Sequence, residues 1–178
     1  MKKFTKILAS AAAAVALFFS TNANAQTPNF GIAANVGVPT NNDYHNLTLG
    51  VDARIQFNVV KQLSVPVTVG YTHFFGKDYQ VAGVNVEAPD YAYVPVKAGL
   101  KYFFSPNGSG LYALGEVGAA FGVSELSKTG FLYSPAIGYS WSNGLDLGVK
   151  YESVSKAVKY TDDNMGHVAL RIAYGFKL

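Results

Sequence analysis

The chain ends in VALRIAYGFKL, residues 168–178, in which two kinds of residue alternate. Every second position from Val168 to Leu178 is apolar, and the positions between them hold Ala, Gly, Arg or Lys. Because successive side chains of a β-strand point to opposite faces, one face of this strand is wholly apolar and the other is small or cationic. The apolar face gains Tyr174 and Phe176 toward its end. This pattern is typical of a strand that ends at a membrane interface.

The first 25 residues predict a signal peptide. A basic segment precedes an apolar stretch over residues 7–19, and Ala23-Asn24-Ala25 supplies the small residues that a signal peptidase recognises. As a membrane anchor the stretch is too short, because a transmembrane helix needs roughly 20 apolar residues. We therefore expect cleavage between Ala25 and Gln26, followed by one domain over residues 26–178.

The formal charge of +3 lies entirely in this leader, which carries Lys2, Lys3 and Lys6. The remaining chain has equal numbers of acidic and basic residues, so the high isoelectric point does not indicate a nucleic-acid partner. The chain has no cysteine, which excludes disulfides and lipid attachment at a processed cysteine. Its content of Tyr, Phe and Gly is typical of an exported all-β domain.

Alternation with a period of two recurs eight times after Gln26. The predicted strands cover residues 30–38, 47–57, 65–72, 94–104, 111–122, 131–141, 145–152 and 168–178. Short connections at 58–64, 105–110 and 142–144 alternate with longer ones at 39–46, 75–93, 123–130 and 153–166. Strands of about 10 residues can cross a bilayer at a tilt, and outer-membrane barrels alternate short periplasmic turns with longer outer loops. The sequence thus predicts an all-β, eight-stranded antiparallel up-and-down transmembrane β-barrel.

Charged residues fall on the face opposite the apolar positions, where a soluble β-sandwich, the alternative fold, would leave them in water. In a barrel the same residues line the lumen. Asp146 and Lys177 share this face. The predicted lumen charge network comprises Asp52, Arg54, Lys97, Lys101, Glu116, Lys150, Glu152 and Arg171. Glu116, Arg171 and Lys150 lie at similar distances from their turns, and Arg54 and Asp52 lie at similar depth. We expect these side chains to meet near the middle of the lumen.

Aromatic residues gather at both ends of the predicted strands, which favours the membrane barrel over the sandwich because Tyr and Trp concentrate at bilayer interfaces. At the turn ends lie Phe57, Tyr102, Phe104, Tyr139, Trp141, Tyr174 and Phe176. At the loop ends lie Tyr71, Tyr93, Phe121, Tyr133 and Tyr151. Three prolines, Pro66, Pro95 and Pro135, fall inside predicted strands, where a closed barrel offers no edge, so we expect frayed ends or bulges there.

Three segments carry a resemblance to a known group: YVPVKAGLKYF (93–103), PAIGY (135–139) and LRIAYGF (170–176). They resemble the small eight-stranded outer-membrane β-barrel proteins of Gram-negative bacteria, the porin-like superfamily. The resemblance implies a monomer in the outer membrane that contacts lipid and lipopolysaccharide and is inserted by the barrel-assembly machinery. One departure is Leu178, since the family usually ends in an aromatic residue. These patterns indicate architecture rather than activity.

Catalysis is not expected. The remote alternative is a lipid-modifying barrel enzyme, but none of His45, His73 and His167 has a serine two positions on, as the lipid A deacylases do. Asp162, Asp163 and His167 could bind a divalent cation at the outer rim, yet solvated loop residues are the favoured interpretation, so no metal or cofactor is predicted.

Two functional hypotheses remain open. In the favoured one, paired charges plug the lumen, and the outer loops, above all residues 75–93, form a surface for an unidentified extracellular ligand. Eight strands leave an interior that side chains can just fill, and unpaired charges there would be costly. In the alternative, the barrel is a narrow porin-like channel for ions or small solutes.

Overall fold

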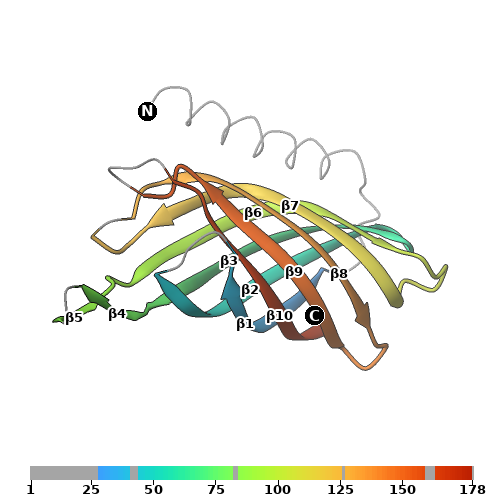
Figure 1. The fold of residues 1–178 in the computed structure, drawn as a ribbon. Helices are drawn as coiled ribbons and strands as arrows, with labels where there is room; N and C mark the ends of the chain where they lie inside the picture. The colour runs from blue at the N-terminus through green and yellow to red at the C-terminus, as the bar shows by residue number, and fades with distance from the viewer. Residues whose placement is uncertain (1–27, 41–43, 82–83, 126, 159–162, 178) are drawn as a thin grey trace, which may run out of the picture.

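The computed structural model describes residues 28–40, 44–81, 84–125, 127–158 and 163–177. Eight strands close into an antiparallel barrel in the order β1-β10-β9-β8-β7-β6-β3-β2 (Figure 1), which confirms the predicted fold. The barrel strands are β1 (Asn29–Pro39), β2 (His45–Val60), β3 (Leu63–Gly76), β6 (Tyr91–Phe103), β7 (Gly110–Gly122), β8 (Gly130–Ser140), β9 (Leu145–Ser155) and β10 (Met165–Lys177). The predicted signal peptide, with Ala25 and Gln26, lies outside the described residues.

The two ends of the barrel differ, as the alternating connection lengths predict. The three short connections, at 61–62, 104–109 and 141–144, lie at one end with the end of β10, and we call this the turn end (Figure 1). The other four connections, at 40–44, 77–90, 123–129 and 156–164, lie at the opposite end, which we call the loop end. The last three are longer than any connection at the turn end, whereas 40–44 is shorter than 104–109. In the reversal between β8 and β9, the backbone N–H of Gly144 donates to the Trp141 carbonyl at 3.2 Å. Gly144 has a φ of 97°, which a side chain would strain.

The exterior carries a continuous apolar surface. Ile137 pairs with Val149, Val149 with Leu170 and Leu170 with Val36, so an aliphatic row crosses β8, β9, β10 and β1. Ile137 and Leu170 are 64% and 63% exposed, so the protein itself leaves this row uncovered. Among the described residues, no helix is long and apolar enough to cross a membrane.

The three prolines lie in strand interiors, and neither frayed ends nor bulges accommodate them. Pairing between β3 and β6 is interrupted beside Pro66 and again beside Pro95, and pairing between β8 and β9 is interrupted beside Pro135. The register is the same on both sides of each gap. A missing N–H donor is therefore accommodated by the local loss of paired residues, and the barrel keeps its register.

The long connection between β3 and β6, which the sequence predicts as a loop, holds a hairpin. β4 (Asp78–Val81) pairs antiparallel with β5 (Val84–Glu87) as a separate two-stranded sheet at the loop end (Figure 1). The segment alternates apolar and polar residues over 79–81 and 84–86, which is the signal for a short strand pair. This hairpin is thus the largest ordered feature among the described loop-end connections.

Candidate functional site

The interior contains three layers, and the first closes the loop end. A loop-end cluster of buried side chains fills this part of the barrel, and its members are Phe74, Tyr91, Tyr93, Ala120, Leu132, Val154, Ala157 and Met165. Phe74 packs edge-on against Tyr91 and against the His167 ring, with ring centroids 5.5 and 5.2 Å apart. Because these residues come from β3, β6, β7, β8, β9 and β10 and from the β9–β10 connection, the cluster joins strands on opposite sides of the barrel.

Two residues of this layer contradict the sequence predictions. Tyr93 was expected on the exterior, but it is fully buried in the lumen because it shares the inward face of β6 with Lys97. Its hydroxyl donates to Oε1 of Glu152 at 2.8 Å. His167 was expected to be a solvated loop residue, but it is 1% exposed and faces the lumen.

The metal candidates are not gathered into a site in the described part of the chain. Asp163 is exposed while His167 is buried inside the barrel, and Asp162 lies outside the described residues. No group of three or more metal-ligating side chains occurs among the residues that the structure describes.

The second layer is a central charge network. Glu116 of β7 is one of its carboxylates. Nη2 of Arg54 donates to both carboxylate oxygens of Glu116, at 3.2 and 3.1 Å. The hydroxyl of Thr68 donates to the same carboxylate at 2.7 Å, and Nζ of Lys97 lies 3.7 Å away. Glu116 therefore ties β7 to β2, β3 and β6 across the lumen.

Glu152 of β9 is the second carboxylate in the network. It forms an ion pair with Lys97, lies 3.3 Å from Nζ of Lys150 and accepts the hydrogen bond from Tyr93. It is fully buried, so these partners replace the water that an ionised carboxylate requires. Glu152 thus connects the charge network to the loop-end cluster.

Asp146 of β9 is the carboxylate nearest the turn end. It accepts hydrogen bonds from Lys101 at 2.6 Å, from Arg171 at 2.9 Å and from the Tyr112 hydroxyl at 2.7 Å. Nζ of Lys101 also lies 3.9 Å from the centroid of the Tyr112 ring, a cation–π geometry. Arg171 thus binds Asp146, whereas Lys150 lies 3.3 Å from Glu152 and 3.8 Å from Asp52.

Every residue of the predicted lumen network is buried, and Asp146 belongs with them. The buried cations are Arg54, Lys97, Lys101, Lys150 and Arg171, and the buried carboxylates are Asp52, Glu116, Asp146 and Glu152. Alternation along each strand, which we call parity, predicts that all of them face the lumen. Sequence reasoning missed the neutral partners, which are Asn35, Thr68, Tyr93 and Tyr112.

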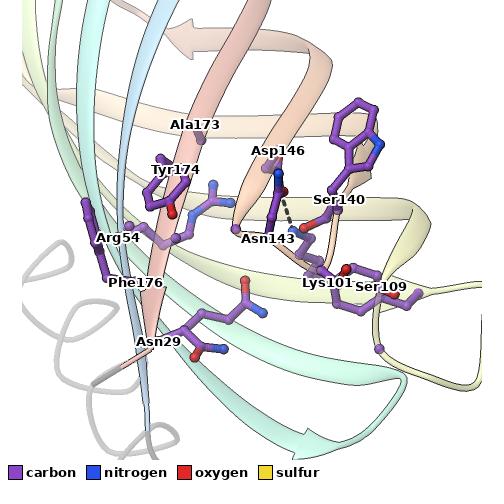
Figure 2. A pocket seen from close by; sticks show the side chains of 18 of the residues that line it. Asn29, Arg54, Lys101, Ser109, Ser140, Asn143, Asp146, Ala173, Tyr174 and Phe176 are labelled. Atoms are coloured by element: carbon purple, nitrogen blue, oxygen red, sulfur yellow. Dashed lines mark hydrogen bonds and ion pairs between the residues drawn. The ribbon is translucent and has the colours of Figure 1, made fainter.

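The third layer is a cavity of about 780 Å³ at the turn end, which we call the turn-end cavity. Figure 2 shows Lys101 and Asp146 pointing toward one another, with Arg54, Asn143 and Ser140 around the same space. Arg171 lines the cavity as well, and Asn29 and Ser109 lie at its outer part. The lumen is thus filled at the loop end and open at the turn end, where the cavity extends to the rim residues Trp141, Tyr174 and Phe176.

The predicted girdle aromatics lie on the exterior, except Tyr93. Exposed side chains at the turn end are Tyr102, Phe104, Tyr139, Trp141, Tyr174 and Phe176, and exposed side chains nearer the loop end are Tyr71, Phe121 and Tyr133. Phe57 and Tyr151 are half-buried. Neighbouring rings contact one another, as Tyr139 and Trp141 do with centroids 4.7 Å apart.

The hairpin is fastened to the barrel through Asp90. The backbone N–H of Gly76 donates to Oδ1 of Asp90 at 2.8 Å, and Nε2 of His73 lies 3.0 Å from Oδ2. Nδ1 of His73 lies 3.1 Å from the Tyr71 hydroxyl. The hydrogen bond from Gly76, and then the contact with His73, hold the pKa of Asp90 below its usual value.

We expect the amide proton shift of Gly76 to titrate with a midpoint below the value of about 3.9 that is typical of an unperturbed aspartate. Since the folded pKa is lowered, Asp90 stabilises the base of the hairpin above about pH 4, and this contribution is lost as the pH falls through the folded pKa. An NMR titration of refolded protein measures the midpoint, and Asp90→Asn, which removes the titrating group, is the control. A midpoint at or above 3.9 would contradict the assignment.

No protein-family model matches the chain, and no curated protein matches it in sequence. Solved structures do match it in fold. Ail, the attachment invasion locus protein of Yersinia pestis, in complex with the heparin analogue sucrose octasulfate, aligns with a TM-score of 0.58 at 18% identity over 85% of this chain and 99% of Ail. The fold is that of a small outer-membrane β-barrel.

Two further barrels show the same likeness over 85% of this chain and 99% of theirs. Neisserial surface protein A aligns with a TM-score of 0.55 at 17% identity. The N-terminal β-barrel domain of Pseudomonas aeruginosa OprF aligns with a TM-score of 0.51 at 13% identity. At these identities the likeness concerns the fold, so the role of this lumen has to be argued from its own residues.

Proposed function

We propose that the chain is a non-enzymatic outer-membrane β-barrel protein whose lumen is closed by paired charges and whose loop end is an interaction surface. The predicted leader supports export, and the uncovered aliphatic row across β8, β9, β10 and β1 supports contact with lipid and lipopolysaccharide. Insertion by the barrel-assembly machinery as a monomer agrees with this architecture.

The observation that carries the closed lumen is the pairing of its buried charges. Glu116, Glu152 and Asp146 each bind at least two donors from other strands, and the loop-end cluster fills the space beyond them. Opening a path for ions would separate these pairs, and removing one partner from a buried pair typically costs about 3–5 kcal/mol. Spontaneous opening is therefore rare.

A narrow channel is the second candidate, and the turn-end cavity favours it. About 780 Å³ of space reaches inward as far as Arg54, Lys101 and Arg171. Conduction would then require only the central network and the loop-end cluster to rearrange. The cavity is thus compatible with a channel that is closed in this structure.

Planar-bilayer recording on refolded protein separates the two candidates. The closed lumen predicts rare, small openings, far below the current of a 16-stranded porin recorded as the positive control. A large, steady conductance in the unmutated protein would reject the plug and establish the channel.

The charges of the loop end restrict the class of ligand that it could bind. The loop-end segments 40–44, 77–90, 123–129 and 156–164 carry four lysines and seven acidic residues in sequence: Lys77, Lys128, Lys156 and Lys159 against Asp43, Asp78, Glu87, Asp90, Glu125, Asp162 and Asp163. A heparin-like polyanion would be repelled by this excess of acidic residues, so the polyanion bound by Ail is not the ligand class that we propose here. A neutral or basic partner fits better.

The location of the protein in the outer membrane can be tested separately. We expect the protein to fractionate with the outer membrane and to refold in detergent micelles as a compact species that migrates differently in gels before and after boiling. The reason is the uncovered aliphatic exterior, which a water-soluble monomer does not tolerate. Recovery as a detergent-independent periplasmic monomer would contradict the membrane location.

A further inference from the structure

We propose that the turn-end cavity is a binding site for a small anion with carboxylate or phosphate groups, entered from the periplasmic side. The site lies at the opposite end of the barrel from the loop-end surface. It therefore goes beyond the proposed function, and it stands or falls independently of the loop-end ligand.

The charges that line the cavity carry the argument. Of the five charged residues among the described lining, four are cations, Arg54, Lys61, Lys101 and Arg171, and one is a carboxylate, Asp146. Glu116 lies behind them and binds Arg54. A bound anion would meet a surplus of positive charge in a recess with low-dielectric walls, where attraction is stronger than in open water.

The whole lumen has the same imbalance. Five cations and four carboxylates are buried among the described residues, so one positive charge lacks a carboxylate of its own. When Arg54 is paired with Glu116, Lys97 with Glu152 and Lys150 with Asp52, Lys101 and Arg171 are left to share Asp146. Because an uncompensated buried cation is costly, an anion beside this pair would be stabilised.

Arg171 has a free donor at this place. Its Nη1 binds Asp146, but its Nε has no hydrogen-bond partner, although the residue is only 4% exposed and lines the cavity. A buried N–H without an acceptor costs free energy that a ligand oxygen would recover. Arginine presents its donors in a planar fork that matches carboxylate and phosphate oxygens.

The shape suits a ligand rather than a single ion. The cavity volume of about 780 Å³ falls within the range of roughly 300–1,000 Å³ that is typical of small-molecule sites. Neutral donors and acceptors from Asn29, Ser109, Ser140 and Asn143 surround the outer part of the cavity. The loop-end cluster closes the other half of the lumen, so the ligand enters past the turns.

The test is calorimetric titration of citrate and, separately, pyrophosphate into protein refolded in a non-ionic detergent at low ionic strength. We expect saturable binding at one site, with an affinity about tenfold lower in Arg171→Gln, because a hydrogen bond to a charged group is lost. Asp146→Asn is expected to tighten binding, since it removes the competing carboxylate. Lys77→Gln, which removes one cation at the loop end, is the matched control and should bind as the unmutated protein does.

A second assay decides the question if the lumen variants do not refold. The chain has no cysteine, so Ser109→Cys places one thiol at the outer part of the cavity. Citrate or pyrophosphate should slow its modification by a negatively charged thiosulfonate. Protection by one anion and not the other identifies a carboxylate or a phosphate as the preferred group. Absence of saturable binding and of protection, or equal affinity in Arg171→Gln, would overturn the proposal, whatever the conductance record shows.

Discussion

Replacing Glu116 with alanine is expected to lower the free energy of unfolding by about 3–5 kcal/mol and to raise the conductance of the barrel. The change leaves Arg54 and Lys97 facing each other in the lumen without the carboxylate that lies between them. Uncompensated cations admit water and anions, so the openings should be anion-selective. Denaturant unfolding in lipid vesicles and planar-bilayer recording measure the two effects.

The double variant Arg54→Met/Glu116→Met is the control for this prediction. It removes both members of the pair and leaves Lys97 with Glu152, so most of the lost stability should return. If Glu116→Ala were as stable as the unmutated protein and conducted as little, the pair would not be what closes the lumen. Loss of stability without added conductance would assign the closure to the loop-end cluster alone.

The fold could be predicted from the sequence because one physical rule, alternation of side chains across a strand, repeats along the chain. The terminal strand illustrates it: Leu170 and Ile172 are exposed, whereas Ala169 and Arg171 between them are buried. The lengths of the connections then set the order and orientation of the strands. Both the alternation and the connection lengths are local features, so they can be recognised in a single sequence.

The pairing inside the lumen could be predicted only in part. Similar depth along the strands predicts that Glu116 meets Arg54, Arg171 and Lys150, and the contact with Arg54 is confirmed. Arg171 binds Asp146 instead, and Lys150 lies beside Glu152. In a barrel the strands tilt and their registers stagger, so equal offsets along two strands are different heights in the lumen. The contact between Arg54 and Glu116 joins residues 62 positions apart, and the closed barrel brings them together.

Two other errors had a signal that was present but not used. Tyr93 has the parity of Lys97, so the same rule that placed the lysine in the lumen also places the tyrosine there. Counting aromatics by their distance from the strand end ignored this parity. His167 likewise has the parity of Arg171 on β10. A rule that combines depth with parity would have found both.

Replacing Val149 with arginine is expected to cost roughly 2–4 kcal/mol of folding free energy in a bilayer. Val149 lies in the middle of β9, is 43% exposed and pairs with Ile137 and Leu170 on the exterior. An arginine there would have to leave its guanidinium in hydrocarbon or draw water into the bilayer. Unfolding of the refolded protein in lipid vesicles measures the cost, and Val149→Leu, which keeps the position apolar, should be close to neutral.

Parity gives this prediction its sharpest control. Ser140 belongs to the inward face of β8 and lines the turn-end cavity, so Ser140→Arg places the same charge in a polar space and need not incur the lipid penalty. The same substitution therefore costs much at one position and little at the other only if the aliphatic row faces lipid. If Val149→Arg were neutral in vesicles while Ser140→Arg was costly, the assignment of the two faces would be reversed. If both were neutral, the barrel would not lie in a membrane, because the cost comes from the hydrocarbon and not from the protein.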